Sequence, residues 1–185
     1  MKKQILWLFL VLVGAVVLYS WIDAADTPQS HVVERELVPD FMAYQLTRRS
    51  YDKDGNLSGQ IKAAQMAHFE QLGQIQFDHP AYTLYEDRQA RWQISSTQGV
   101  FYQDNKAILE QNVRVDNLHS DEMFRQIQTE QLELVLDTQL LQTDQPVLVL
   151  GQNFQIHGRG LQADLVAQKL RLYKHHGTVY QNESQ

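Results

Sequence analysis

Short apolar runs separated by polar residues fill the last third of the chain, from Phe124 to Tyr180. Val, Leu and Ile dominate these runs. Four polar breaks interrupt them: Asp137-Thr138, Asp144-Gln145-Pro146, Gly151-Gln152-Asn153 and His157-Gly158-Arg159-Gly160. Apolar runs of this length between such clusters are typical of short antiparallel strands. The pattern therefore predicts an all-β fold, with each of these clusters acting as a turn.

The same pattern recurs further upstream in the chain. Four isoleucines serve as anchors: Ile61, Ile94, Ile127 and Ile156, at spacings of 33, 33 and 29 residues. Fourteen positions after each anchor stands a large aliphatic residue, namely Ile75, Ile108, Leu141 and Leu170. A fixed offset inside each unit, with length changes only between units, indicates an internal repeat. The alternative is a chance alignment of units with low identity.

Composition excludes several classes of function. The chain has 185 residues, enough for one domain plus an appendage, and a formal net charge of −6. No basic stripe is available to neutralise phosphates, which argues against nucleic-acid binding. The absence of cysteine excludes disulfides, thiolate metal sites and a thiol nucleophile.

Residues 5–22 form an uncharged apolar run of 18 residues, preceded by Lys2 and Lys3. At about 1.5 Å per residue, a helix of this length spans about 27 Å, close to the thickness of the hydrocarbon core. Since basic residues remain cytoplasmic, the body is expected across the membrane. A cleaved signal peptide is the alternative, but the run is long for one and no clean small-x-small cleavage site follows. The sequence thus predicts a cytoplasmic segment at 1–4, a transmembrane helix at 5–22 and a linker at 23–38.

The body is expected to begin at residue 39 and to contain a dozen or more strands. The candidates before residue 124 are Phe41–Tyr51, Leu57–Ala67, Gln74–Tyr85, Trp92–Tyr102 and Ala107–Val115. Gln60–Gln71 can also be drawn as a helix. The last candidates are Leu165–Tyr173 and Thr178–Tyr180, followed by a frayed tail at 181–185. Asp52–Asn56 is interpreted as a hairpin turn, because the further ligands that a calcium loop needs are missing.

No catalytic or metal-binding constellation stands out. His175 and His176 are adjacent, so on a strand they point to opposite faces and cannot bind one ion together. The acidic residues are scattered, with no pair spaced as an acid/base couple. An enzyme and a cofactor are therefore not expected. The run Val147–Leu150 lacks polar alternation, which predicts a strand buried on both faces or one that faces both a core and a ligand.

Five stretches of the chain form a recognisable combination. The most specific is Gly151-x-x-Phe154-x-Ile156-x-Gly158-x-Gly160-Leu161-x-Ala163-Asp164-Leu165. The others are the apolar N-terminal segment, Pro39-Asp40-Phe41, Tyr51-Asp52-x-x-Gly55 and Arg125-x-Ile127-x-Thr129-x-x-Leu132. Together these stretches resemble the LptC family of lipopolysaccharide export proteins. The resemblance covers the whole chain, and it lies in the combination of these features more than in any one motif.

The resemblance implies an open, twisted β-jellyroll at residues 39–180 in the periplasm, held at the inner membrane by one helix. It implies that the domain receives lipopolysaccharide from the transporter subunits LptF and LptG, which the ATPase LptB drives. The domain would then pass lipopolysaccharide to LptA for delivery to the outer membrane of a Gram-negative cell. No bond is made or broken in this process, so no catalytic residue is implied.

The resemblance also suggests functional residues. Leu46 and Phe77 match family positions that resemble cavity-lining residues, and Leu170 is a weaker match. Gly151 matches a glycine of the family's C-terminal motif. A glycine there is expected to supply a positive φ or a close approach of the backbone. The C-terminal edge carries Leu170, Leu172, Tyr173, Val179 and Tyr180, and the resemblance implies that LptA binds there and LptF near the opposite end. Lys169, Arg171 and Lys174 would instead blunt this edge if it has no partner.

Two other functions remain open from the sequence. A membrane-anchored β-scaffold that binds only protein partners would use the same apolar residues as ordinary core. A glycan-acting enzyme is a weaker alternative, because the chain lacks a carboxylate pair.

Overall fold

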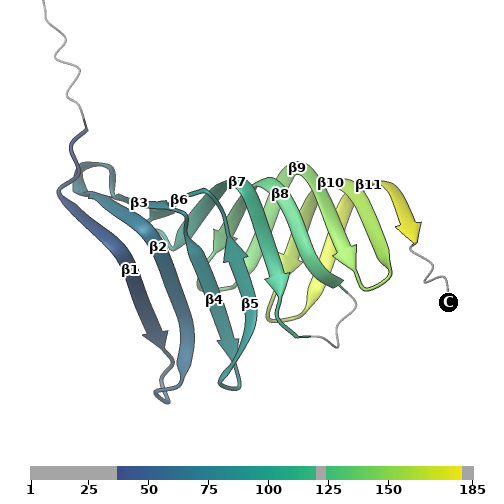
Figure 1. Ribbon diagram of the computed structural model, residues 1–185, viewed down its shortest axis with the longest axis horizontal. Helices are drawn as coiled ribbons and strands as arrows, with labels where there is room; N and C mark the ends of the chain where they lie inside the picture. The colour runs from purple at the N-terminus through teal and green to yellow at the C-terminus, as the bar shows by residue number, and fades with distance from the viewer. Residues whose placement is uncertain (1–36, 120–123, 181–185) are drawn as a thin grey trace, which may run out of the picture. The chain divides into compact units, whose positions relative to one another are not determined.

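The computed structural model describes residues 37–119 and 124–180, and the chain from Leu37 onward forms one compact unit (Figure 1). These residues form eleven antiparallel strands joined in one sheet, which confirms the all-β prediction. The single helical element in these ranges is a 3₁₀ turn at Glu70–Leu72. None of the described helical residues forms a segment able to cross a membrane. The predicted membrane helix at 5–22, the linker up to residue 36 and the tail at 181–185 lie outside the described residues.

The bounds of the eleven strands are β1 Phe41–Tyr51, β2 Leu57–Phe69, β3 Gln74–Asp78, β4 Ala81–Glu86, β5 Gln89–Ser95, β6 Gln98–Tyr102, β7 Lys106–Asn117, β8 Phe124–Val135, β9 Leu140–Gly151, β10 Phe154–Asp164 and β11 Lys169–Tyr180. Most strands pair with the next strand along the chain, but β3 pairs with β6, β4 with β2, and β5 with β7. The sheet order ends with β8, β9, β10 and β11 side by side, as Figure 1 shows. In the described sheet, β1 and β11 are the two edge strands, each paired on one side.

The sheet is folded along a line that crosses its strands. β2 pairs with β3 through one half of its length and with β4 through the other, and β7 divides in the same way between β6 and β5. We call the halves the β3–β6 wall and the β4–β5 wall; each includes the segments of β7 to β11 in line with those strands. Side chains from both walls share one core cluster, so the walls pack face to face.

Irregular backbone marks the fold line in the long strands. The register shifts between Glu110 and Val113 in β7, where Gln111 and Asn112 adopt positive φ angles of 63° and 54°. β9 and β10 shift against each other at the segment before Leu161, where Gly160 has a φ of 74°. Such β-bulges bend a strand and increase its local twist, which lets one strand contribute to both walls.

This geometry corrects two of the predicted turns. Asp144-Gln145-Pro146 and His157-Gly158-Arg159-Gly160 lie inside β9 and β10, whereas Asp137-Thr138 and Gln152-Asn153 do connect strands. Bulges and turns draw on the same polar residues and glycines, so the sequence pattern does not separate them. The described residues therefore contain fewer and longer strands than the predicted dozen or more.

The strand predictions upstream are also refined. Gln60–Gln71 is mostly strand, as favoured over the helix, and it ends in the 3₁₀ turn. The single strands predicted at Gln74–Tyr85 and Trp92–Tyr102 each divide in two, at His79-Pro80 and at Ser96-Thr97. Both breaks lie on the fold line, where the Thr97 backbone N–H donates to the Gln111 carbonyl of β7 at 2.9 Å.

The register confirms the internal repeat at seven of its eight positions. The four anchors Ile61, Ile94, Ile127 and Ile156 belong to one cross-strand row, completed by Tyr82, Val115 and Val149. A second row on the opposite wall contains Ile75, Leu141 and Leu170, with Phe101, Ala107, Leu134 and Ala163 between them. Ile108 is displaced by one residue, since Ala107 takes its place in that row. Apart from Ile108, which is on the outer face, the repeat is one of inward-facing positions.

The turn between β1 and β2 is the predicted hairpin. The Asp52 carboxylate accepts the backbone N–H groups of Asn56 at 2.8 Å and Asp54 at 3.0 Å. These hydrogen bonds hold the pKa of the Asp52 carboxyl below its ordinary value, and the bond from the Asn56 backbone has the largest effect. The carboxylate is engaged by its own turn, and the described residues contain no group of three potential metal ligands from His, Asp and Glu.

Candidate functional site

The largest apolar surface of the described chain is the interior between the two walls. Its main cluster joins Leu84, Trp92 and Ile94 of the β4–β5 wall to Leu132 and Leu141 of the opposite wall. Along β7 to β10, inward side chains are almost fully buried, while their outward neighbours are polar or half-buried. The predicted run Val147–Leu150 follows this alternation: Val147 and Val149 are buried, but Leu148 and Leu150 face outward and are half-buried, so the strand is not buried on both faces.

The interior continues toward β1 in a second, less enclosed cluster. Ile61, Ala63 and Phe77 form it, and Leu46 of β1 packs against them. Phe77 meets Phe101 edge to face, with ring centroids 4.9 Å apart at 70°. Tyr82 contacts both clusters, and burial raises the pKa of its phenol. Two of the three predicted lipid-contacting residues, Leu46 and Phe77, thus lie together at this end.

The third predicted residue, Leu170, lies at the other end of the sheet. It is on β11, where Leu170 and Leu172 are half-buried and pack against the main cluster. Seven strands lie between β11 and β1 in the sheet order, so Leu170 is not brought near Leu46. The three residues instead mark the two ends of one apolar interior, and side chains at both ends are only partly covered.

The remaining predicted edge residues are exposed on β11. Tyr173, Val179 and Tyr180 are 57%, 56% and 74% exposed. The predicted strands Leu165–Tyr173 and Thr178–Tyr180 are one strand, Lys169–Tyr180, and Leu165 belongs to the preceding turn. Lys169, Arg171 and Lys174 are exposed on the same strand. The edge therefore combines exposed apolar and basic side chains with unpaired backbone.

Gly158 holds this edge against β10, a role that sequence reasoning missed. A Cβ atom there would lie 2.5 Å from Leu172 Cδ2 and 2.7 Å from the Lys174 carbonyl oxygen. Gly158 is buried at the register shift between β10 and β11. The signal in the sequence was a glycine inside an apolar strand pattern, which commonly marks a bulge or a close approach of backbone.

Gly151 ends β9 with a close side-chain contact. Its φ lies outside the left-handed region, so a positive φ is not the reason for glycine there. A Cβ atom would lie 2.2 Å from Phe154 Cε1 and 2.3 Å from Phe154 Cζ. The close approach of the Phe154 ring, the second of the two expected reasons, therefore accounts for this glycine.

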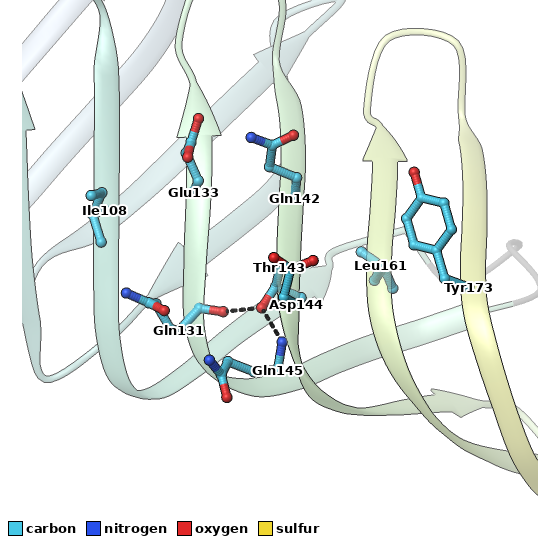
Figure 2. Close-up of a pocket in the computed structure, with 9 residues that line it drawn as sticks. All are labelled: Ile108, Gln131, Glu133, Gln142, Thr143, Asp144, Gln145, Leu161 and Tyr173. Atoms are coloured by element: carbon cyan, nitrogen blue, oxygen red, sulfur yellow. Dashed lines mark hydrogen bonds between the residues drawn. The ribbon is translucent and has the colours of Figure 1, made fainter.

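A polar cavity of about 490 Å³ lies on the outer face of the β3–β6 wall (Figure 2). Most of its lining side chains are polar: Gln131, Glu133, Gln142, Thr143, Asp144 and Gln145, joined by Ile108, Leu161 and Tyr173. The Thr143 hydroxyl donates to the Gln131 carbonyl at 2.6 Å and accepts the Gln145 backbone N–H at 3.1 Å. Amides and carboxylates do not suit acyl chains, so the interior is the better candidate for an apolar ligand.

Fold and site together define an all-β protein whose folded antiparallel sheet carries an apolar interior toward both edge strands. The family model described as "Lipopolysaccharide-assembly, LptC-related" matches residues 8–181. The chain belongs to this family, and membership implies a role in lipopolysaccharide export.

Two relatives agree with the family match. The lipopolysaccharide export system protein LptC of Haemophilus influenzae is 24% identical over 205 residues, covering 100% of this chain and 98% of the relative. The protein of the same name from Escherichia coli strain K12 is 23% identical over 183 residues, covering 98% and 96%. The similarity thus extends over the whole chain at low identity.

Substitution of Gly151 tests the close contact with Phe154. Gly151→Ala is expected to lower the free energy of unfolding by about 1–3 kcal/mol, because the added methyl group displaces the half-buried Phe154 ring from its place against Gly151. Gly151→Arg should be worse and should impair lipopolysaccharide transport when it is the only copy. Urea unfolding of the full chain in detergent measures the first effect, and growth of the complemented strain measures the second.

Gly177→Ala is the matched control, because a Cβ atom at Gly177 meets nothing within 4 Å. Its free energy of unfolding should change by no more than about 0.5 kcal/mol. Equal losses in the two alanine variants would refute the contact argument, and normal growth with Gly151→Arg would refute the effect on transport.

Proposed function

We propose that this chain is a non-enzymatic component of the lipopolysaccharide transport machinery. It receives lipopolysaccharide from the inner-membrane ABC transporter of LptF and LptG, driven by LptB, and passes it to LptA. The observation that carries the proposal is the pair of apolar rows that run through the interior from β2 to β11. Family membership supports the same conclusion.

The energetics of acyl chains explain why such an interior is needed. Exposing a chain of a dozen carbons to water costs on the order of 10 kcal/mol, at about 0.8 kcal/mol for each CH₂. A carrier must therefore offer apolar surface along the whole path. In the proposed open jellyroll, the acyl chains lie between the walls among the inward rows, at Leu46, Phe77 and Leu170.

The proposed location is the inner membrane, with the main domain in the periplasm. The uncharged segment at 5–22 has the length of a single-pass helix, and Lys2 and Lys3 precede it. Residues 23–38 then serve as the linker, residues 39–180 as the jellyroll domain, and residues 181–185 as a tail. This arrangement puts the apolar interior next to the source of the lipid.

The two edge strands are the proposed docking surfaces. β11 has Leu170 and Leu172 facing the interior and unpaired backbone on its outer side, so a strand of LptA added there would extend the apolar rows. LptF is proposed near β1, where Leu46 and the partly covered second cluster mark the other end. An added strand at each end would also remove an exposed sheet edge.

A scaffold that binds only protein partners is the second candidate. One observation favours it, namely that the interior is filled by its own side chains, with Ile127, Leu132, Leu141 and Leu161 all fully buried. In that case the apolar rows would serve as core alone, and no lipid would contact them.

Photocrosslinking separates these two functions. A photoreactive side chain at Leu46, Phe77 or Leu170 is expected to crosslink to lipopolysaccharide in cells, because these positions face the interior. Crosslinked adducts are detected by immunoblotting of the protein with an antibody against lipopolysaccharide.

The controls are the residues next in sequence, which point to the opposite face. Thr47, Gln76 and Arg171 are all exposed and differ from the test positions by one residue. Equal labelling of test and control positions, or no labelling of either, would reject the interior as a lipid path and leave the scaffold function.

Removal of β11 tests the docking edge. A chain that ends after Gln168 lacks β11, and it is expected to lose binding to LptA while it still co-purifies with the transporter. A photoreactive side chain at Tyr180 in the full chain should crosslink to LptA, because this exposed residue lies at the end of the edge strand. Undiminished capture of LptA by a well-folded truncated chain would show that the bridge uses another face.

A further inference from the structure

The rims of the two walls meet around a cavity of about 220 Å³. From the β4–β5 wall it is lined by Leu84, Glu86, Arg91 and Trp92, and from the opposite wall by Gln139 and Leu165, which lie in the turns after β8 and β10. Leu84, Trp92 and Leu165 also belong to the main apolar cluster. This cavity therefore lies where the rim adjoins the apolar interior.

Trp92, one of the residues that line this cavity, has a hydrogen-bond donor without a partner. Its side chain is 2% exposed and stacks on Phe124, with ring centroids 5.4 Å apart at 23°. The indole Nε1 is buried and has no hydrogen-bond partner among the described residues. A buried N–H without an acceptor is costly, and in native structures such a group calls for an explanation.

The surroundings restrict what the missing acceptor can be. An indole N–H donates only, so the ligand must supply an acceptor atom. The cross-strand neighbour Leu84 and the stacked Phe124 offer no acceptor through their side chains. A carbonyl oxygen at the head of an acyl chain needs a single donor, and its chain fits the apolar cluster.

The outer rim of the cavity is polar, and few hydrogen bonds hold the turn after β10 that lies beside it. Arg91 Nε lies 3.6 Å from Glu86 Oε2 at this rim. The turn after β10 is tied to the neighbouring turn by the Leu165 N–H, which donates to the Gln139 carbonyl at 3.2 Å. Val166, the next residue in that turn, is 64% exposed. Leu165 and Trp92 line the same cavity, so a shift of this turn would widen the cavity beside Trp92 without disturbing a strand pairing.

We propose that the rim at Trp92 is a subsite for the ester or amide carbonyl of an acyl chain. Movement of the Leu165 turn uncovers the indole N–H, which donates to the carbonyl oxygen while the chain enters the interior. The polar carrier of the acyl group stays at the outer rim beside Arg91 and Glu86. This inference rests on the proposed function and names a recognition element within it.

Two probes with the same chain length test the subsite. Sucrose monododecanoate carries an ester carbonyl, and dodecyl maltoside carries an ether oxygen in its place. The full chain is used with Trp7→Phe and Trp21→Phe, which leave Trp92 as its single tryptophan, in nanodiscs of ether-linked phospholipid that bring no acyl carbonyl. Below the micelle concentrations of both probes, the ester is expected to bind about five- to tenfold more tightly by calorimetry. Ester binding should also change the Trp92 emission.

Trp92→Phe should abolish the preference for the ester and leave the affinity for the ether unchanged. Tyr85→Phe is the control, because Tyr85 also lines the cavity but its hydroxyl donates to Gln60 Oε1 at 3.5 Å, and this variant should retain the preference. If Trp92→Phe fails to fold, replacement of Trp92 by its benzothienyl isostere removes the N–H at nearly constant shape. Loss of the ester preference in that protein would support the subsite.

An ester preference that survives removal of the N–H, or the absence of binding by either probe, would overturn the proposal. These outcomes are distinct from failure of the transport function. Lipopolysaccharide crosslinks at Leu46, Phe77 and Leu170 together with an unchanged preference would reject the subsite alone. An N–H-dependent preference without those crosslinks would reject lipopolysaccharide as the ligand and retain the acyl-carbonyl subsite.

Discussion

Packing between two rows of inward-facing side chains holds this sheet in its folded form. The row from Ile61 to Ile156 lies on one wall and the row from Ile75 to Leu170 on the other, and most members between the ends are fully buried. This contact is possible because bulges and short breaks bend the strands at one line. The sheet needs no covering layer of helices, since each wall buries the apolar face of the other.

The same packing becomes incomplete toward the two edge strands. Leu46 and Ile75 near β1, and Leu170 and Leu172 on β11, are only half-buried. The apolar interior therefore extends from one edge strand of the sheet to the other. At each end it reaches a strand whose outer backbone groups are unpaired. A neighbouring domain that adds a strand would extend the apolar interior and pair the free backbone groups of the edge strand at the same time. Under the proposed function, this incompleteness is what allows lipid to pass from one domain to the next.

Much of this architecture could be predicted from the sequence, because inward positions repeat in type and spacing. The four anchoring isoleucines share one row, and the hairpin at Asp52 and the edge at β11 follow from local pattern. The fold line could not be predicted. Bulge residues such as Asp144 and Gly160 resemble turn residues, and whether a chain turns or bends there depends on pairing with distant strands.

The candidate functional residues also include some that the sequence could predict and some that it could not. Leu46, Phe77 and Leu170 were predicted from resemblance, and all three face the interior, although at opposite ends. The roles of Gly158 and Trp92 depend on contacts with residues far along the chain or on the lack of a partner, and neither property is visible in a local pattern. Similarly, the polar outer cavity near Tyr173 joins five strands and has no sequence signature.

A direct test of the central claim is the separation of the two walls with and without lipid. The chain has no native cysteine, so Asp87→Cys at the tip of the β4–β5 hairpin and Thr138→Cys in the turn after β8 would carry the sole pair of spin labels. If acyl chains occupy the interior, the distance between the labels should increase on binding of lipopolysaccharide, because the present interior is filled by side chains. An unchanged distance distribution in protein with stoichiometric bound lipopolysaccharide would contradict the claim that the lipid lies between the walls.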